Sequence, residues 1–435
     1  MKKGYYLIFL FLSTFHLSAQ SLYFPPLIGK TWDTLSPSNL GWCVSKTDSL
    51  YSYLESKNTK GFLVLQDGKI VLEKYFGTFT QDSFWYWASA GKTMSALMIG
   101  IAQQKGLLSI NDTSSTYLGK GWTSLSQAQE DKIKIRHQLT MTSGLDDTGV
   151  NKDCTFDSCL VYKADAGTRW AYHNAPYTLL DKVLEAASSV TWQQFFNVEV
   201  RNKTGIGGLW IKSDFNNVLY SNTRSMARYG LLLLNQGKWD QTTILNDTAY
   251  FRQMTHASQT LNPAYGYLTW LNGSPKFMAP GSQLVFNGML APNAPSDMFA
   301  AMGKNGQLIN VVPSLNLVLV RIGDAPGDNG EVPISFNNDI WFYLNKVMCK
   351  GVSGLNQLKD LKGVSIYPNP AQTSIEIQGL NQGQNCTLKI MDLRGNILSV
   401  VTNEMNLNIS DLSAGCYILS LETQTGVVYK KFVKN

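Results

Sequence analysis

The pattern of apolar and polar residues divides the chain into two parts. Near its C-terminal end, short runs alternate between apolar and polar residues, with turn signals at Gly395-Asn396 and Thr425-Gly426. Alternation with a period of two is typical of β-strands that bury one face, and short strands at regular spacing favour a sandwich. We therefore expect a linker at 351–362 and a small all-β sandwich at 363–435, with strands within 374–378, 387–391, 417–421 and 427–433.

The preceding part, 21–350, mixes strand and helix patterns. Asp67-Gly68 lies between two apolar runs and is a strong hairpin signal, and Pro313 lies between two more such runs. Between these hairpins, 89–255 has mainly helical periodicity, and a last helix is expected at 336–349. Strands at both ends with helices between them predict an α+β domain whose antiparallel sheet is built from both termini.

Composition excludes two classes of protein. The chain has 435 residues, of which 44% are hydrophobic and 16% are charged, so it can bury a sizeable core and does not resemble a disordered chain. Its net charge is +6, but Lys and Arg form no run or stripe, so nucleic-acid binding is not expected. The sequence therefore describes a folded protein with one large domain and one small one.

The first 19 residues have the pattern of a signal peptide. Lys2 and Lys3 precede an apolar run at 5–15, and Leu17-Ser-Ala-Gln20 supplies small residues for cleavage after Ala19. This run is shorter than the ~20 apolar residues of a membrane span, and no later run is long enough. We expect a signal peptide at 1–19 and an exported mature protein without a membrane span; a retained N-terminal anchor is the alternative.

Export makes the cysteines candidates for disulfides. Cys154 and Cys159 bracket a short polar loop and are expected to pair, whereas sequence alone does not fix the partners of the other four. The Cys and His residues lack metal-binding spacing, so neither a metal site nor a cofactor is expected.

Ser89 and Lys92 are the first candidates for chemistry. Three residues apart at the start of a predicted helix, they lie on the same face and within reach of one another. The helix N-terminus favours negative charge on the serine oxygen and lowers the proton affinity of the lysine. A serine nucleophile with a lysine base needs this arrangement, although Ser-x-x-Lys alone also fits an ordinary N-cap serine.

Two other motifs overlap these residues and fail. Gly91-Lys-Thr93 could end a phosphate-binding loop, but Tyr86 stands where that loop needs glycine. Trp87-Ala-Ser-Ala-Gly91 approaches the nucleophile elbow of α/β-hydrolases, but Trp87 replaces the first glycine of the elbow. A histidine base would have to be His173 or His256, which no motif supports.

Two further elements could complete a site. Tyr172 can shuttle a proton near a lysine ammonium, and Asn174 could donate to a substrate carbonyl and bind Lys92. The other element is Lys304-Asn305-Gly306-Gln307, which follows Gly303 at the start of a predicted strand. Glycine there lets a substrate approach the strand edge, and a backbone N–H can point at an oxyanion. Taken alone, this stretch also fits a turn between strands.

Together, Ser89-x-x-Lys92, Tyr172-x-Asn174 and Lys304-x-Gly306 resemble the serine β-lactamase and penicillin-binding family, closest to its class C and esterase-like members. The resemblance spans most of 21–350 and includes stretches at 136–145, 226–239 and 265–270. It implies the β-lactamase-like fold. In this fold, helices near the two termini pack side by side, which would bring Cys43 near Cys349.

The resemblance also implies the role of each residue. Ser89 is the acylated nucleophile, Lys92 its proton acceptor, and Tyr172 the general base and then the acid. The oxyanion would lie between the backbone N–H groups of Ser89 and Gln307. The remaining substrate contacts are expected from Asn174, Lys304, Asn305 and Gly306.

The substrate implied is a small-molecule or peptide amide or ester. Asn305 stands where true β-lactamases usually carry Thr or Ser to hold a substrate carboxylate. An esterase, D-amino-acid peptidase or amide-oligomer hydrolase is therefore favoured over a true β-lactamase. Phe84-Trp-Tyr-Trp87 could line an apolar acyl pocket or belong to the core. The alternative from another class is a catalytically inactive, surface-sorted binding protein on the same scaffold.

The C-terminal domain resembles the type IX secretion C-terminal sorting domain. The matching residues are Tyr367-Pro-Asn-Pro370, the Gly395 turn, 412–417 and the terminal 430–434. This resemblance implies the type IX secretion machinery as a partner, with export through the periplasm to the medium or the cell surface. A generic accessory β-domain is the alternative.

Overall fold

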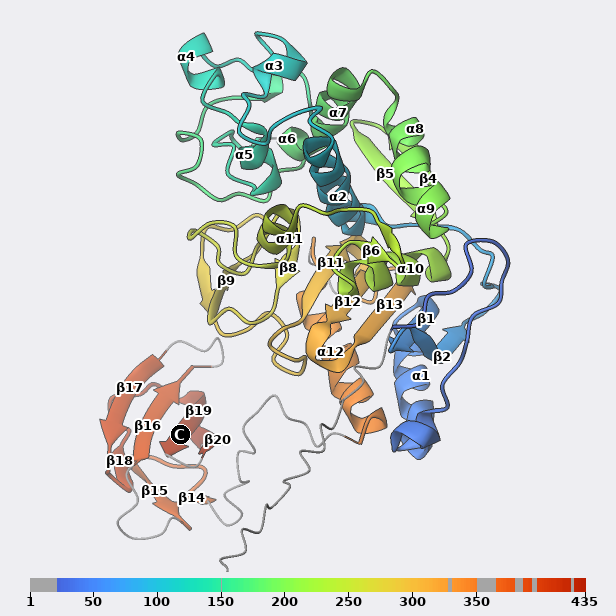
Figure 1. Ribbon diagram of the computed structural model, residues 1–435. Coiled ribbons are helices and arrows are strands. Elements are labelled where there is room, and N and C mark those ends of the chain that lie inside the picture. The colour runs from blue at the N-terminus through green and yellow to red at the C-terminus, as the bar shows by residue number, and fades with distance from the viewer. Residues whose placement is uncertain are drawn as a thin grey trace, which may run out of the picture. The chain divides into compact units, whose positions relative to one another are not determined.

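The structure is a computed structural model (Figure 1) that describes residues 22–149, 151–327, 331–349, 365–379, 386–392, 397–423 and 426–435. These residues form two compact units. The first holds the described residues through Ala291 and Pro295–Ile340, and the second holds Pro292–Ala294 and the described residues from Trp341 onward. The predicted signal peptide and linker lie outside the described residues.

The first unit is built on a six-stranded antiparallel sheet in the order β2-β1-β13-β12-β11-β8. β1 and β13 come from opposite ends of the unit and pair at its centre, with Leu63 opposite Val320. The prediction of a sheet built from both termini is therefore confirmed. The strands are β1 (Thr59–Gln66), β2 (Lys69–Tyr75), β8 (Trp270–Leu271), β11 (Phe299–Gly303), β12 (Gln307–Val312) and β13 (Leu317–Gly323).

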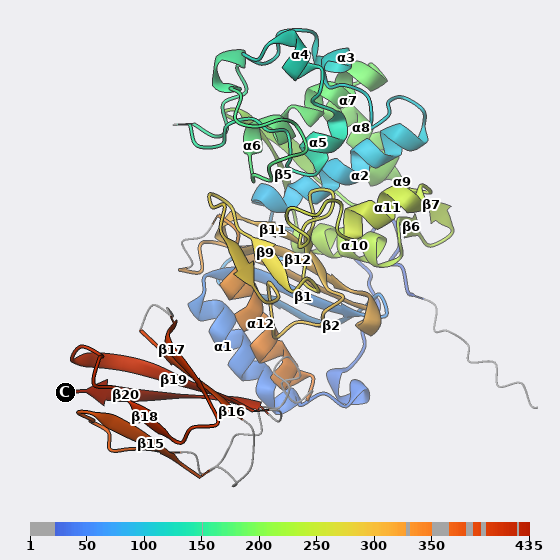
Figure 2. The ribbon, with the colours of Figure 1, turned by 90° about the vertical axis from the view of Figure 1, so that its left-hand side faces the viewer.

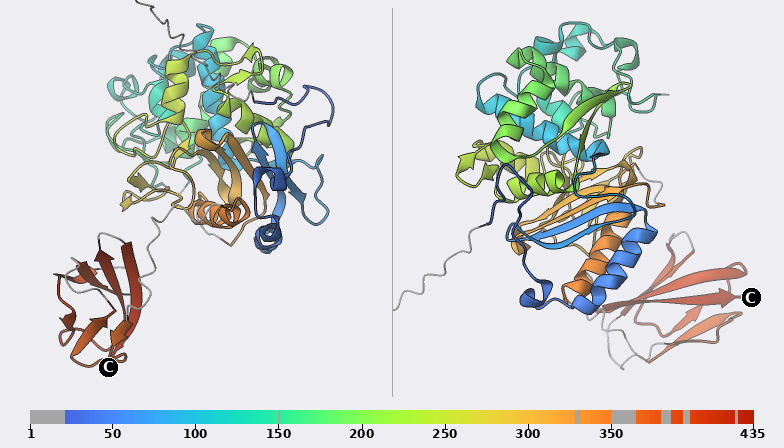
Figure 3. Two further views of the ribbon diagram at one scale, coloured as in Figure 1. Left: turned by 60° about the horizontal axis from the view of Figure 1, so that its bottom comes forward. Right: turned by 90° about the vertical axis from the view of Figure 1, so that its right-hand side faces the viewer.

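Helices cover both faces of this sheet (Figures 2 and 3), which explains why its central strands are apolar on both sides. α1 (Thr47–Ser56) and the first half of α12 (Ile334–Val347) lie on one face, where Tyr53 Oη donates to Asp339 Oδ2 at 3.0 Å. α10 (Thr223–Leu234) packs on the other face. A β-carbon on its Gly230 would stand 2.4 Å from Val318 Cγ1, so this close approach requires glycine.

The segment between the two hairpins carries most of the helices, as predicted. It also contains the antiparallel sheet β3-β5-β4, which the sequence did not predict. Besides α10, its helices are α2 (Gly91–Gln104), α3 (Ser115–Leu118), α4 (Gln127–Glu130), α5 (Ile135–Leu139), α6 (Asn174–Thr178), α7 (Leu180–Ser188), α8 (Trp192–Phe196), α9 (Asn202–Thr204) and α11 (Thr248–Thr255). Its short strands are β3 (Trp85–Tyr86), β4 (Leu209–Ser213), β5 (Asn216–Ser221), β6 (Lys238–Trp239), β7 (Thr242–Thr243), β9 (Lys276–Met278) and β10 (Val285–Asn287).

The C-terminal strands form two antiparallel sheets, as the sandwich prediction requires. One has the order β14-β15-β18, with strands Ser365–Tyr367, Ser374–Gln378 and Asn406–Asn408. The other has the order β17-β16-β19-β20, with strands Ile397–Thr402, Cys386–Met391, Gly415–Thr423 and Gly426–Lys434. Alternate residues of β16 are buried, and they join a core that includes Ile375, Leu388, Leu419 and Phe432. The predicted turn at Gly395-Asn396 lies outside the described residues.

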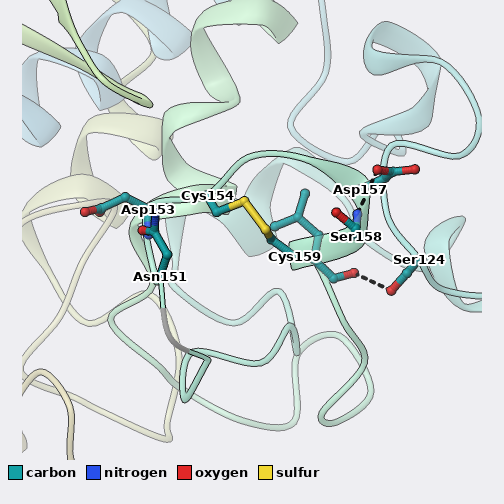
Figure 4. Close-up of a disulfide and its surroundings, with 8 residues drawn as sticks. Ser124, Asn151, Asp153, Cys154, Asp157, Ser158 and Cys159 are labelled. Atoms are coloured by element: carbon teal, nitrogen blue, oxygen red, sulfur yellow. Dashed lines mark hydrogen bonds between the residues drawn. A yellow bond between two sulfur atoms is a disulfide. The ribbon is translucent and has the colours of Figure 1, made fainter.

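Cys154 and Cys159 form the predicted disulfide (Figure 4). Cys43 and Cys349 are each disulfide-bonded. Cys386 and Cys416 are free thiols. Within the part of the chain that the structure describes, no helix is long and apolar enough to cross a membrane.

Candidate active site

Ser89 and Lys92 face each other at the start of α2. Ser89 lies in a 3₁₀ turn, Ala88–Ala90, that leads into the helix, and Lys92 Nζ donates a 2.9 Å hydrogen bond to Ser89 Oγ. The residue before the serine, Ala88, has a φ of 48°, a left-handed conformation that costs energy for a residue with a side chain. The turn therefore holds Ser89 in a geometry that the backbone would not adopt freely.

Lys92 is almost completely buried, with 3% of its side chain exposed. Burial lowers its pKa to about 7, although the nearby charges of Asp153 and Glu331 act in the opposite direction. Its Nζ also lies 4.1 Å from the ring centroid of Tyr177 and 5.1 Å from that of Tyr172. Near neutral pH, a large fraction of Lys92 is therefore the free amine, which can accept a proton.

Tyr172 lies next to Ser89, in the segment that leads into α6. Its ring stacks on Trp270 at 5.6 Å and meets the edge of Tyr265 at 6.3 Å. Burial raises the pKa of Tyr172 above its usual value, while its hydrogen bond with Ser89 acts in the opposite direction. Tyr172 is therefore a phenol at neutral pH and can donate a proton.

These three residues share a cavity of about 470 Å³. Of the predicted site residues, it is lined by Ser89, Lys92, Tyr172, Asn174 and Lys304. Sequence reasoning missed the rest of the lining, which comprises Ala88, Asn151, Lys152, Asp153, Tyr177, Ser213, Asn216, Asn217, Val218 and Glu331. Four of them, Asn151, Lys152, Asp153 and Glu331, lie outside helices and strands, and four more lie in β4 and β5, which the sequence did not predict. Tyr177 lies one helical turn beyond Asn174, so its position offered a sequence signal.

Asn174 has a different partner from the one expected. Its Nδ2 donates to Asp153 Oδ1 at 2.7 Å, and its buried Oδ1 has no hydrogen-bond partner among the described residues. The hydrogen bond of Lys92 goes instead to Ser89. Asn174 therefore joins the loop at Asp153 to the helix that follows Tyr172.

The turn at Lys304–Gly306 is oriented differently from the prediction. Asn305 donates from Nδ2 to Tyr86 Oη at 2.7 Å, and a β-carbon on Gly306 would stand 2.6 Å from Arg321 Nη1. Gln307 is fully buried, and its Nε2 donates to Gly323 O at 2.6 Å. Of the predicted Lys304–Gln307 contacts, only Lys304 lines the cavity.

The glycine that abuts the serine turn is Gly303. A β-carbon on Gly303 would stand 2.5 Å from Trp87 O, 2.8 Å from Ala90 N and 3.0 Å from Ser89 N. The end of β11 therefore lies directly against the backbone of the nucleophile turn, and the next residue along the chain is Lys304.

His173 and His256, the histidines that could have served as a base, lie outside this cavity. His173 is buried, and burial lowers its pKa to about 4; His256 lines another cavity, of about 760 Å³. Neither lines the cavity that Ser89 shares with Lys92. Over the described ranges, no three residues among His, Cys, Asp and Glu gather in an arrangement that could hold a metal ion.

The aromatic run before Ser89 does not line the cavity either. Trp87 is fully buried, and its Nε1 donates to Ser221 Oγ at 2.6 Å. Trp85 donates to Gly323 O at 3.2 Å. Of the two readings, a structural role for Trp85 and Trp87 is therefore the one that the contacts favour.

Comparison with known proteins gives two family matches. Residues 59–330 match the family model described as Beta-lactamase, and residues 365–435 match the one described as Secretion system C-terminal sorting domain. A protein of Alkalihalophilus pseudofirmus, described as uncharacterized, is 24% identical over 312 residues, which are 63% of this chain and 85% of that protein.

Solved structures share the fold at low sequence identity. One is described as "Putative 6-aminohexanoate-dimer hydrolase from Bacillus anthracis", with a TM-score of 0.55 and 16% identity over 73% of this chain and 89% of that one. Another is a "putative beta-lactamase" from Bacteroides dorei, with a TM-score of 0.54 and 16% identity over 71% of this chain and 99% of that one. The similarity thus extends across most of the unit that holds the Ser89 cavity.

Proposed function

Because the chain belongs to the β-lactamase family, as its sequence predicted, and carries a secretion sorting domain, we propose that it is an exported serine hydrolase that cleaves an amide or ester through an acyl-enzyme on Ser89. The observation that carries this proposal is the 2.9 Å hydrogen bond from Lys92 Nζ to Ser89 Oγ within a shared cavity. A buried lysine with a pKa of about 7 next to a serine hydroxyl supplies the base that the serine needs.

Acylation begins with the free amine of Lys92. As Ser89 Oγ bonds to the substrate carbonyl carbon, its proton passes to Lys92 and the carbonyl π electrons move onto oxygen. The ammonium that forms lies 4.1 Å from the ring of Tyr177, whose π face stabilises positive charge. The cavity thus favours charge on Lys92 as the tetrahedral intermediate forms.

Collapse of this intermediate breaks the bond to the leaving amine or alcohol. Tyr172, a phenol in hydrogen-bonding contact with Ser89, gives the leaving group a proton and regains one from the Lys92 ammonium. In deacylation, water adds to the acyl carbon and its proton passes to Lys92; Ser89 Oγ then leaves as the acid forms and takes this proton back from the Lys92 ammonium. In this scheme Lys92 is the general base and Tyr172 only the general acid, whereas the resemblance implied both roles for Tyr172.

We assign the oxyanion to the backbone N–H groups of Ser89 and Lys304, in place of the expected pair of Ser89 and Gln307. Two contacts support this revision. Gly303, the residue before Lys304, abuts the Ser89 backbone, whereas Gly306, the residue before Gln307, packs against Arg321. Lys304 also lines the cavity, and Gln307 is fully buried outside it.

The contact made by Asn305 supports an esterase, D-amino-acid peptidase or amide-oligomer hydrolase over a true β-lactamase. Asn305, which takes the place of the carboxylate-binding Thr or Ser, donates a hydrogen bond from its amide Nδ2 to Tyr86 Oη.

We further propose cleavage of a signal peptide after Ala19 and delivery by the type IX machinery to the medium or the cell surface.

A substrate panel tests the reaction. Purified mature protein and its Ser89→Ala variant are assayed with short-chain p-nitrophenyl esters, D-amino-acid peptides, linear amide oligomers and a chromogenic cephalosporin. We expect turnover of an ester or amide by the wild type, and a loss on the order of 10³-fold or more in Ser89→Ala. Equal activity of the two proteins on every substrate would refute the proposal.

A further inference from the structure

Asp153 places a carboxylate in the wall of the Ser89 cavity. Asn174 donates to its Oδ1 at 2.7 Å, and its own backbone N–H donates to Asn151 Oδ1 at 3.0 Å. Its negative charge reaches Lys92, whose pKa it acts to raise. The carboxylate is therefore close enough to the reacting groups to interact with a bound substrate.

Asp153 differs from the other carboxylate of the cavity in having no cationic partner. Glu331 is paired with Lys152 at 2.6 Å. Among the described residues, no Lys, Arg or His forms an ion pair with Asp153. Lys92 does not compensate for it permanently, because the reaction requires Lys92 as the free amine. Asp153 thus has no ion-pair partner of its own, although Lys304 lines the same cavity.

The position of Asp153 is fixed by its neighbours. Cys154, the next residue, is 5% exposed and is bonded to Cys159, so the chain is anchored directly after Asp153. Figure 4 shows the Asp153 carboxylate pointing away from this disulfide. Asn174 holds it from the other side, on the helix that follows Tyr172. Because the backbone after Asp153 and its side chain are both held, the carboxylate is suited to binding a charged group at a fixed distance from Ser89.

We propose that Asp153 binds the cationic amine of the substrate, so that the enzyme selects amides or esters whose acyl or leaving group carries a free amino group. This inference rests on the proposed hydrolase function and names its substrate class. An ammonium group would give Asp153 an ion-pair partner and form a charge-assisted hydrogen bond with the carboxylate oxygen that does not accept from Asn174. Neutral or N-acylated analogues would leave the carboxylate unpaired.

The test compares primary alkylamines with alcohols of the same chain length, from ethyl to octyl, as competitive inhibitors of p-nitrophenyl acetate hydrolysis at neutral pH. We expect at least one amine to inhibit the wild type roughly tenfold more strongly than its matched alcohol. Asp153→Asn keeps the shape and can still accept from Asn174, and it should abolish that preference while the alcohols inhibit as before. Asp157→Asn, on the same disulfide loop but outside the cavity, should retain it.

Two results would overturn the inference. One is equal inhibition by amines and alcohols at every chain length in the wild type, and the other is an unchanged amine preference in Asp153→Asn. If Asp153 acted only on Lys92, its substitution would shift the pH profile for all substrates and leave the ratio of amine to alcohol inhibition unchanged.

Failure of the proposed function is distinguishable from failure of this inference. A protein that hydrolyses p-nitrophenyl acetate through Ser89 without any amine preference refutes the amine site alone. If no ester is cleaved, calorimetric titration of the wild type and Asp153→Asn with hexylamine still tests the site, because binding requires no turnover. Equal binding of hexylamine by the two proteins would then refute it.

Discussion

Gly303 lies so close to Ser89 that a β-carbon on the glycine would stand 3.0 Å from the serine backbone nitrogen. Two further atoms of the nucleophile turn, Trp87 O at 2.5 Å and Ala90 N at 2.8 Å, would be closer still. All three atoms are backbone, so they cannot move aside as a flexible side chain can. The spacing between β11 and the nucleophile turn is therefore set by the absence of a side chain at position 303.

Gly303→Ala should separate β11 from the Ser89 turn and disturb the proposed oxyanion site. Because a misplacement of about 1 Å can cost on the order of 10²-fold, we expect a loss of that size in kcat/KM for an ester. Gly149→Ala is the control, since a β-carbon there meets nothing within 4 Å. Wild-type kcat/KM in a folded Gly303→Ala protein would contradict the assignment of the oxyanion donors.

The pH dependence of activity should follow Lys92. Its ammonium form cannot accept a proton from Ser89, so kcat/KM for a neutral ester should rise with pH through a midpoint near 7 and then level off. Tyr172, with its pKa raised, stays protonated over this range and should cause no loss on the alkaline side. Rates measured from about pH 5 to about pH 9 test this. A flat profile would exclude Lys92 as the base.

Lys92 should also reduce the stability of the fold. The folded state lowers its pKa from the ordinary value of 10.5 to about 7, so between these values the unfolded chain binds a proton that the folded chain does not. The wild type should therefore gain stability as pH rises through that window.

Methionine has a shape similar to lysine but no charge, so burying it does not require the loss of a proton. Lys92→Met should therefore abolish activity yet raise the free energy of unfolding at neutral pH by about 1–2 kcal/mol. In a thermal melt, each kcal/mol should raise Tm by roughly 2–4 °C. The difference in stability between Lys92→Met and the wild type should shrink as the pH rises towards about 10. Lys105→Met, at the other end of α2, removes an ion pair with Glu199 and should bring no such gain. Lower stability of Lys92→Met than wild type at neutral pH would contradict the burial argument.

Strands and turns with a clear apolar pattern or a specific turn sequence could be predicted from the sequence. Asp67-Gly68 marked the hairpin of β1 and β2, because its turn conformation is encoded in two residues. The strand at 374–378 was predicted at its observed limits, because one face of it is buried. The pairing of β1 with β13 could be inferred only from the arrangement of the whole domain.

The cavity wall could not be predicted in the same way. Asp153, Glu331 and Asn216 come from segments distant in the sequence, and only tertiary packing brings them beside Ser89. The turn at Lys304–Gly306 was recognised as functional, but its orientation depends on Arg321, which donates from Nη1 to Asn305 O at 2.6 Å. Sequence spacing alone could not distinguish Gly303 from Gly306 as the glycine at the nucleophile.

Removal of residues 363–435 should separate export from catalysis. The first unit has its own sheet and cavity, so the truncated protein should remain active but accumulate in the periplasm. Cell fractionation with an ester assay on each fraction measures this. Full-length Ser89→Ala should be secreted normally but inactive. Normal secretion of the truncated protein would exclude a sorting role for these residues.

Covalent labelling with a fluorescent fluorophosphonate, followed by peptide mass spectrometry, tests directly whether Ser89 is a nucleophile activated by Lys92. A serine activated by a neighbouring base reacts with this reagent, whereas an ordinary serine hydroxyl does not. We expect one label on Ser89, no label in Ser89→Ala or Lys92→Ala, and full labelling in His173→Ala. An unlabelled wild type, or a label on another serine that requires His173, would contradict this role of Ser89.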